Sequence, residues 1–146
     1  MGGISLGGMQ IMTNIAGRYS LRRHVIDAST GRPRPIISFS TQYVPVLTAL
    51  AQTYVMGAFS GEARTMFTDR KGRIFDQHFI AATYKAGMLK LAQSMPIVLG
   101  DRCGAQGLHG VNQLSTLHVR AAAAICFVMV HADVVPITRR IIGVPR

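Results

Sequence analysis

The sequence is poor in charged residues, and in acidic residues above all. Only 15% of its 146 residues are charged, and six aspartates and glutamates stand against 16 lysines and arginines. A hydrophobic fraction of 49% is enough for a sizeable core, which excludes an intrinsically disordered chain. The net charge of +10 predicts a surface that attracts anions such as nucleic acid, anionic lipid or phosphate-bearing cofactors.

Cysteines and long apolar runs are also scarce. Cys103 and Cys126 do not form a metal-binding motif, which favours a reduced, intracellular chain. The longest apolar run, residues 121–130, is shorter than the roughly 18 residues of a membrane span and suits a buried helix. The start has no basic region of a signal peptide, and the end is no Ser-Lys-Leu signal. We therefore expect a cytoplasmic protein, or a peroxisomal one if its source is eukaryotic.

The titratable residues predict no catalytic constellation and no metal site. The five histidines are His24, His78, His109, His118 and His131, and none pairs with another at metal-ligand spacing. No Ser-His-Asp arrangement is present. The one glutamate, Glu62, follows Gly61 in a polar stretch and is an implausible catalytic base.

Helical periodicity is the main signal of organisation. It predicts helices at residues 4–25, 39–67, 74–103 and 115–132, with a loop at 27–35 and a charged turn at 69–73. Pro45 must lie in the first turns of its helix or kink it, and Pro96 should kink the third helix late. No strand alternation persists. The sequence thus predicts an all-α, antiparallel four-helix bundle over residues 1–132 and an atypical tail at 133–146.

Apolar rows on these segments predict the helix faces. The apolar stripe of the second helix contains Val44, Leu47, Leu50, Ala51, Tyr54 and Phe59. The third helix carries two rows, of which one is Phe75, Phe79, Ala82, Ala86 and Leu89 and the other is Ile80, Tyr84, Met88 and Leu91. Exposed apolar surface for self-association is expected on the first helix, at Gly7, Gly8, Met9, Ile11 and Met12.

A basic cluster and a glycine-rich turn are the candidate binding elements. Arg18, Arg22 and Arg23 lie near the end of the first helix, where they supply planar donors for phosphate or simply complement the helix dipole. Residues 101–107 (DRCGAQG) follow the third helix. Their glycines permit close approach of a ligand to the backbone, or else form a left-handed helix C-cap. This turn is not a Rossmann fingerprint, because no strand precedes it.

Four segments together resemble those of the acyl-CoA oxidases, flavin enzymes related to the acyl-CoA dehydrogenases. Residues 18–25 (RYSLRRHV) are similar to the family's RYSAVRHQ. Residues 37–42 and 49–54 (ISFSTQ and ALAQTY) are similar to LDFQTQQ and LLATAY. Residues 78–86 (HFIAATYKA) and 102–108 (RCGAQGL) are similar to a helix that ends in a Cys-Gly-Gly-His-Gly-Tyr type motif. In this order they identify residues 2–125 as similar to the family's C-terminal helical domain.

The resemblance implies a flavin site at a dimer interface, with FAD as cofactor and acyl-CoA as substrate. It implies that Arg23 contacts the FAD phosphates of the partner subunit, and that Gly104, Ala105 and Gly107 approach the cofactor closely. The family's full-length enzymes remove the pro-2R proton of acyl-CoA with a carboxylate and pass hydride to the flavin. Oxygen then reoxidises the flavin and yields hydrogen peroxide.

The sequence departs from the family pattern in three places. It lacks the N-terminal helical domain and the β domain, and Gly3 stands where the family has an arginine. Residues 124–129 (AICFVM) occupy the place of the catalytic glutamate, and no carboxylate follows before Asp133. We therefore expect a fragment or truncated paralogue of an acyl-CoA oxidase that is inactive alone and has no catalytic residue of its own.

Two other function classes remain as alternatives. A non-enzymatic helical module would keep the family's dimer surface and act by interaction alone. A basic nucleic-acid-binding bundle is disfavoured, because arginines and aromatic residues do not alternate on one face. The expected partners are therefore a second copy of the chain or the missing enzyme domains, with neither nucleic acid nor a membrane span.

Overall fold

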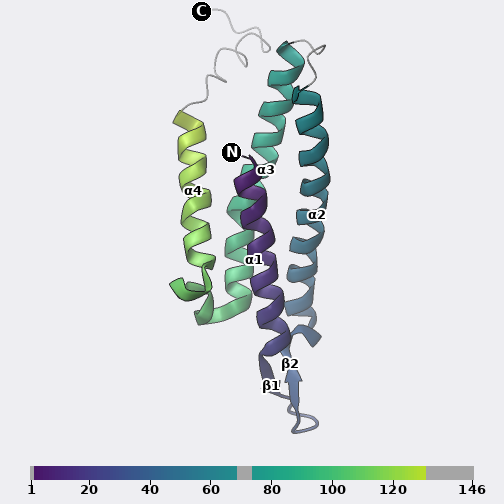
Figure 1. Cartoon of the computed structure of the whole chain (residues 1–146). Helices are drawn as coiled ribbons and strands as arrows, with labels where there is room; N and C mark the ends of the chain where they lie inside the picture. The colour runs from purple at the N-terminus through teal and green to yellow at the C-terminus, as the bar shows by residue number, and fades with distance from the viewer. Residues whose placement is uncertain (1, 69–73, 131–146) are drawn as a thin grey trace, which may run out of the picture.

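Four helices make up most of the molecule, which a computed structural model describes over residues 2–68 and 74–130 (Figure 1). They are α1 (Gly2–Arg22), α2 (Ser40–Thr68), α3 (Ile74–Cys103) and α4 (Leu114–Val130). Neighbouring helices alternate in direction, and α3 contacts each of the other three. The expected all-α, antiparallel four-helix bundle is confirmed. The charged turn at 69–73 and the tail at 133–146 lie outside the described residues.

The prolines fall inside the helices without ending them. Pro45 lies in the second turn of α2, within the first turns where it was expected. It has no N–H to donate to the Thr41 carbonyl, which accepts from Arg102 Nη1 instead. Pro96 is buried within α3, which continues to Cys103. None of the described helices is long and apolar enough to cross a bilayer.

A short β-hairpin replaces the loop expected after α1. Strands β1 (His24–Ile26) and β2 (Pro33–Pro35) pair antiparallel, with Val25 opposite Arg34, and extend beyond the end of the bundle (Figure 1). The expectation of an uninterrupted helix to residue 25 was therefore wrong. Two prolines in one strand disguised the hairpin, yet a strand at a sheet edge tolerates them because its outer N–H groups need no partner.

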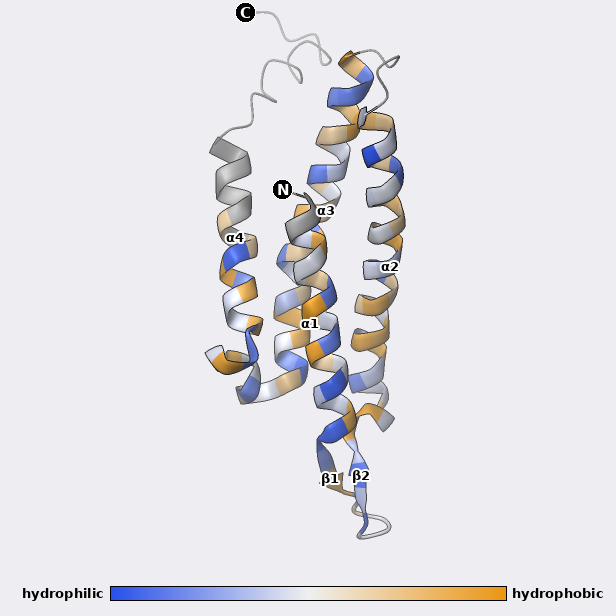
Figure 2. Ribbon diagram, in the orientation of Figure 1, coloured by the Kyte–Doolittle hydropathy of each residue, from blue (hydrophilic) through white to orange (hydrophobic). Residues whose placement is uncertain are grey.

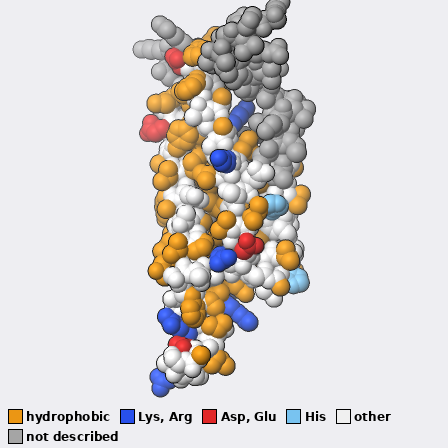
Figure 3. All heavy atoms as spheres, turned by 180° about the vertical axis from the view of Figure 1, so that it is seen from behind, with side chains coloured by type: hydrophobic (Ala, Val, Ile, Leu, Met, Phe, Trp, Pro, Cys, Tyr) orange, Lys and Arg blue, Asp and Glu red, His pale blue; other side chains and the backbone are white. Residues whose placement is uncertain are grey.

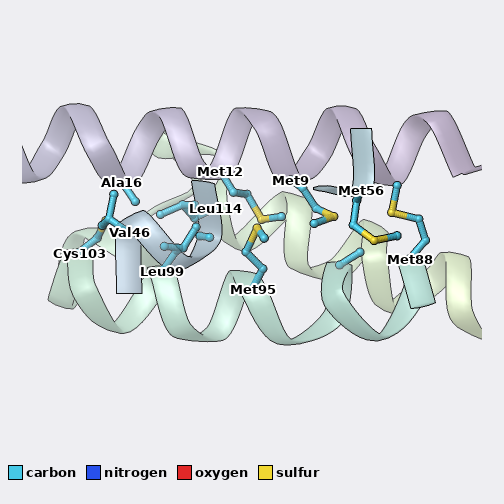
Figure 4. Packing of buried hydrophobic residues seen from close by; sticks show 12 residues of the cluster. Met9, Met12, Ala16, Val46, Met56, Met88, Met95, Leu99, Cys103 and Leu114 are labelled. Carbon is cyan, nitrogen blue, oxygen red and sulfur yellow. The ribbon is translucent and has the colours of Figure 1, made fainter. Parts of the chain in front are cut away.

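The core between the helices is rich in methionine (Figure 4). Met9 and Met12 of α1 pack with Met56 of α2 and with Met88 and Met95 of α3, together with Leu99 and Leu114. Met9 and Met12 are at most 1% exposed, so their expected role in an exposed association surface was wrong. Methionine side chains are unbranched and fill irregular gaps between helices.

The apolar stripe expected on α2 lies on the outside of the bundle. Figure 2 shows hydrophobic residues along much of this helix. The residues that α2 buries are Gln42, Val46, Ala49, Thr53, Met56 and Ala63. Val44, Leu47, Leu50, Tyr54 and Phe59 are all exposed. In α3 the row with Met88 and Leu91 packs on the core, while Phe75 and Phe79 of the other row are exposed.

Candidate functional site

The basic cluster forms an exposed surface where α1 ends and the hairpin begins. The side chains of Arg18, Arg22 and Arg23 are all exposed at the last turns of α1. The backbone of Arg23 is fixed, because its N–H donates to Tyr19 O at 2.9 Å and its carbonyl accepts from Ile36 N at 2.9 Å. Neither Arg18, Arg22 nor Arg23 forms an ion pair within the described part of the chain.

Arg34 of the hairpin differs from these three arginines. Its guanidinium lies 3.7 Å from the Asp27 carboxylate, donates to Ser38 Oγ at 2.7 Å and lies over the Phe39 ring. Hydrogen bonds from the Ser29 hydroxyl and backbone N–H hold the pKa of Asp27 below its ordinary value, and Arg34 lowers it further. Arg34 therefore stabilises the hairpin, whereas the cluster on α1 keeps its charges free for an anion.

The glycine-rich turn follows α3 as a 3₁₀ helix over Gly104–Leu108. Gly104 has a φ of +59° directly after the last residue of α3, so it forms the left-handed C-cap that the sequence left open as an alternative. A Cβ on Gly104 would meet nothing within 4 Å, and Ala105 is exposed. Gly107 is buried, and its missing Cβ makes room for Gly100 of α3.

A polar junction centred on Gln42 joins the family-like segments. Gln42 Nε2 donates to Ser20 Oγ of α1 at 2.8 Å and to the Arg102 carbonyl of α3 at 2.9 Å. Arg102 Nη1 in turn donates a hydrogen bond to the Thr41 carbonyl at 3.0 Å. Ser20 is three residues before Arg23, and Arg102 is two residues before Gly104. The junction thus brings both candidate binding elements to one end of the bundle.

The reasoning from sequence missed this junction. The family resemblance includes Gln42 in residues 37–42 without a role, although a glutamine in register with Val46 and Ala49 on the inner face of α2 indicates a buried polar contact. Arg102 Nε is buried and has no hydrogen-bond partner within the described residues. A donor in this position is available to an acceptor from outside the described chain.

The remaining titratable groups of the described residues do not assemble into a catalytic site. His24, His78 and His109 are exposed, His118 is half-buried, and His131 lies outside the described residues. Glu62, Asp76 and Asp101 are exposed on three separate turns of α2 and α3. The described residues contain no cluster of histidine, cysteine and carboxylate side chains that could hold a metal ion. Burial raises the pKa of the Cys103 thiol, which disfavours a nucleophilic thiolate.

The comparison with known families agrees with the four family-like segments of the sequence and with the helical bundle. The family model described as "Acyl-CoA oxidase, C-alpha1 domain" matches residues 5–129. The chain belongs to this family. No curated protein and no solved structure matches the chain.

The C-alpha1 domain offers a surface that fits a phosphate-bearing cofactor. Arg18, Arg22 and Arg23 carry charges that no described carboxylate neutralises, a Cβ on Gly104 would meet nothing within 4 Å, and Ala105 is exposed. The turn differs in one respect from a ligand cradle, because Gly107 is required by the packing of the chain on itself. Arg23, Gly104 and Ala105 are therefore better placed than Gly107 to meet a ligand.

Proposed function

We propose that this C-alpha1 domain supplies part of the FAD site of an acyl-CoA-oxidising flavoprotein and is not itself active. Arg23 holds the diphosphate of the FAD bound by a partner subunit, and the turn lies against a cofactor through Gly104 and Ala105, whereas Gly107 packs on Gly100. When bound, FAD supplies the acceptor for a hydride from acyl-CoA. The chain's own contribution is to bind and orient the cofactor.

The observation that carries this proposal is the Gln42 junction. Three of the four segments that resemble the family share these hydrogen bonds between α1, α2 and α3, and the bonds place the arginine cluster and the glycine turn at the same end. An arginine guanidinium suits a diphosphate, because its parallel N–H donors match two phosphate oxygens. If the arginine cluster only complemented the dipole of α1, it would not need to lie at the same end of the bundle as the glycine turn.

We expect the domain alone to be inactive, because none of the described carboxylates is positioned as a base. Removal of a proton from carbon requires a base within hydrogen-bond reach of that proton. The described carboxylates are Asp27, Glu62, Asp76 and Asp101, and each of the last three projects from a different helical turn into solvent. We expect the domain with added FAD and acyl-CoA to produce no hydrogen peroxide. Peroxide formation that depends on acyl-CoA would contradict this part of the proposal.

The cofactor site is tested by the binding of FAD and ADP to the whole chain. Arg23→Ala removes charge-assisted hydrogen bonds worth about 1.5–3 kcal/mol each, so affinity should fall roughly tenfold to a hundredfold. Isothermal titration calorimetry measures this loss for both ligands. ADP shares the diphosphate of FAD and therefore reports on Arg23 without the isoalloxazine ring.

The matched control is Arg64→Ala. Arg64 is exposed on α2 near the end of the bundle opposite the hairpin. Its substitution by alanine removes the same charge as Arg23→Ala. Arg73, another exposed arginine expected from the sequence, lies outside the described residues and is a weaker control. Binding should survive Arg64→Ala. Equal losses from Arg23→Ala and Arg64→Ala would show that only the overall charge of +10 attracts the ligand.

The second candidate function is a non-enzymatic helical interaction module. It is favoured by the exposed apolar residues of α2 and α3, among them Leu47, Tyr54, Phe75 and Phe79. If the chain is an interaction module without a cofactor, the wild type should bind FAD and ADP no more tightly than the Arg23→Ala variant does. The calorimetric experiment therefore separates the two candidates.

A further inference from the structure

The hairpin that follows α1 contributes nothing to the hydrophobic core. No residue of β1 or β2 belongs to the core cluster, and all of them except Pro35 are exposed. A pair of such short strands is only marginally stable in water by itself. Here the ion pair between Asp27 and Arg34 and the bond from Arg34 to Ser38 hold it in place. An element that is fixed, extends beyond the bundle and buries no core residue is a candidate docking surface (Figure 1).

One face of the hairpin is apolar. Residues that lie opposite each other in an antiparallel pair share a face. The register of β1 with β2 thereby places on one face His24, Ile26, Pro33 and Pro35, called here the Ile26 face. The side chain of Ile26 is 77% exposed. Arg34 lies on the other face, where its guanidinium is over the Phe39 ring. The Ile26 face therefore carries no lysine, arginine or carboxylate.

The outer edge of β2 has no backbone donor at its two prolines. Ile36 N donates to the Arg23 carbonyl at 2.9 Å, and hydrogen-bonded positions alternate along an antiparallel pair. Pro33 and Pro35 therefore occupy the positions whose N–H would point away from β1. An N–H group without a partner is costly in a medium that excludes water. The prolines remove this cost for a hairpin that leaves water.

Arginines flank the Ile26 face. Residues 18–35 contain five arginines and a single carboxylate, Asp27, which is paired with Arg34. Arg22 at the base of the hairpin and Arg32 near its tip are exposed and form no ion pair within the described residues. Figure 3 shows lysine and arginine side chains beside hydrophobic ones at this end of the molecule. Exposed apolar side chains between unpaired cations are typical of elements that bind the surface of anionic membranes.

We propose that the hairpin docks on an anionic lipid surface through the Ile26 face. Three residues of extended strand span about 10 Å, and apolar side chains of interfacial elements enter a membrane by roughly 5–10 Å. Ile26 and Pro33 reach the boundary between headgroups and acyl chains, while Arg22 and Arg32 contact lipid phosphates. This docking goes beyond the proposed cofactor site and does not use Arg23.

Nucleic acid fits the same surface less well. Residues 24–35 contain no phenylalanine, tyrosine or tryptophan that could stack on bases. Phosphates would meet the arginines but would leave Ile26 beside polar groups. A lipid surface offers anionic groups and an apolar layer together, which is the combination that the hairpin presents.

The apolar contact is tested by sedimentation of the whole chain with vesicles of phosphatidylserine and phosphatidylcholine. Ile26→Ala should weaken partitioning roughly tenfold, because burial of each methylene group favours transfer from water by about fourfold. The matched control is Ile74→Ala, since Ile74 is 73% exposed at the opposite end of the molecule and should not affect binding. Partitioning that Ile26→Ala leaves unchanged would overturn the proposal.

The electrostatic contact is tested with the same vesicles. Arg32→Gln should weaken partitioning about fivefold, whereas Arg64→Gln on α2 should have little effect. Vesicles of phosphatidylcholine alone should bind the wild type far more weakly. Equal losses from the two arginine variants would show that only the overall charge of +10 attracts the chain, and would overturn the proposal.

A DNA duplex tests nucleic acid as the alternative occupant. DNA binding that is lost with Arg32→Gln but unchanged by Ile26→Ala, without binding to the anionic vesicles, would assign the surface to nucleic acid and overturn the proposal. Calorimetry with FAD on Ile26→Ala should give the wild-type affinity. Failure of the lipid docking and failure of the cofactor site are therefore distinguishable.

Discussion

At the scale of single residues, the glycines after α3 serve two different physical needs. Gly104 ends the helix with a φ of +59°, a conformation that side chains with a Cβ adopt only with strain. A Cβ on Gly107 would lie 2.5 Å from the Gly100 carbonyl oxygen and 3.1 Å from its carbonyl carbon. Both neighbours are backbone atoms, so α3 or the turn would have to move. The fold of the turn thus requires these glycines before any ligand is considered.

Substitution of Gly107 should therefore destabilise the protein. Gly107→Ala forces the turn away from α3, and overpacking of this kind typically costs about 1–3 kcal/mol. Gly110→Ala is the matched control, since a Cβ on Gly110 meets nothing within 4 Å. Urea denaturation followed by circular dichroism gives both free energies of unfolding. A loss from Gly107→Ala no larger than that from Gly110→Ala would contradict the close contact with Gly100.

The buried thiol of Cys103 should make stability depend on pH. Burial raises the pKa of Cys103 above its ordinary value of 9.0, because the apolar surroundings disfavour the thiolate. Above that pH the unfolded chain releases the thiol proton while the folded chain keeps it. The free energy of unfolding should then fall as pH rises past 9.0, and the contribution of Cys103 should be fully present below that pH.

Comparison with Cys103→Ala isolates this contribution from other groups that titrate at high pH. Urea denaturation between neutral pH and pH above 9.0 should show a steeper loss of stability for the wild type than for Cys103→Ala. Parallel curves for the two proteins would mean that the thiol titrates alike in the folded and unfolded chains.

At the scale of secondary-structure elements, three helix ends depend on one side chain. Gln42 is 9% exposed and donates both of its bonds to other helices, to Ser20 Oγ of α1 and to the Arg102 carbonyl of α3. Ser20 is fully buried and itself donates to the Ala16 carbonyl at 2.7 Å. A buried network of this kind fixes the relative positions of the elements that it joins.

Loss of the Gln42 amide should loosen this end of the bundle. Gln42→Leu removes both donors and leaves the Arg102 carbonyl without its partner, at a cost of about 1–3 kcal/mol. Gln93→Leu on the exposed side of α3 is the control. In a double-mutant cycle, Gln42→Leu and Ser20→Ala should couple by about 0.5–1.5 kcal/mol. Strict additivity of the two changes would show that the bond between these side chains contributes nothing to stability.

The helices could be predicted from the sequence more closely than their contacts. Residues 74–103 were predicted as one helix with the bounds that α3 has, since its apolar rows persist over many turns. The stripe of α2 was misleading, because bulky apolar residues such as Leu47 and Tyr54 lie outside while Gln42 and Thr53 lie inside. The hairpin escaped because strands of three residues carry too little alternation to be detected. The Gln42 junction depends on long-range geometry that periodicity does not contain.

The sequence predicted some features of the candidate site and missed others. Arg18, Arg22 and Arg23 were expected at a helix end, and α1 does end at Arg22. The convergence of this cluster with the glycine turn within one copy was not predicted, because Arg23 and Gly104 are far apart in the chain. The roles of Arg23, Gly104, Ala105 and Gly107 toward FAD stay predictions that ligand binding tests.

At the scale of the whole molecule, methionine connects the three long helices. Five buried methionines, Met9, Met12, Met56, Met88 and Met95, belong to a single core cluster that spans α1, α2 and α3. Thr13 of α1 adds polar contacts to this cluster through Thr53 Oγ1 at 3.4 Å and Met95 Sδ at 3.7 Å. One continuous core in a small domain favours cooperative unfolding, in which all its side chains become exposed together.

Methionine oxidation should report this cooperativity. Met66 is 54% exposed on α2, whereas the five core methionines are at most 7% exposed. Under dilute hydrogen peroxide Met66 should form the sulfoxide first, and the core methionines should react together at a much lower rate set by opening of the bundle. Peptide mapping by mass spectrometry at successive times gives each rate. A subdenaturing urea concentration should speed the oxidation of all five core residues by the same factor and leave that of Met66 almost unchanged. If Met88 reacted as fast as Met66 while Met9 stayed protected, α3 would open separately from α1, and the three helices would not form one cooperative unit.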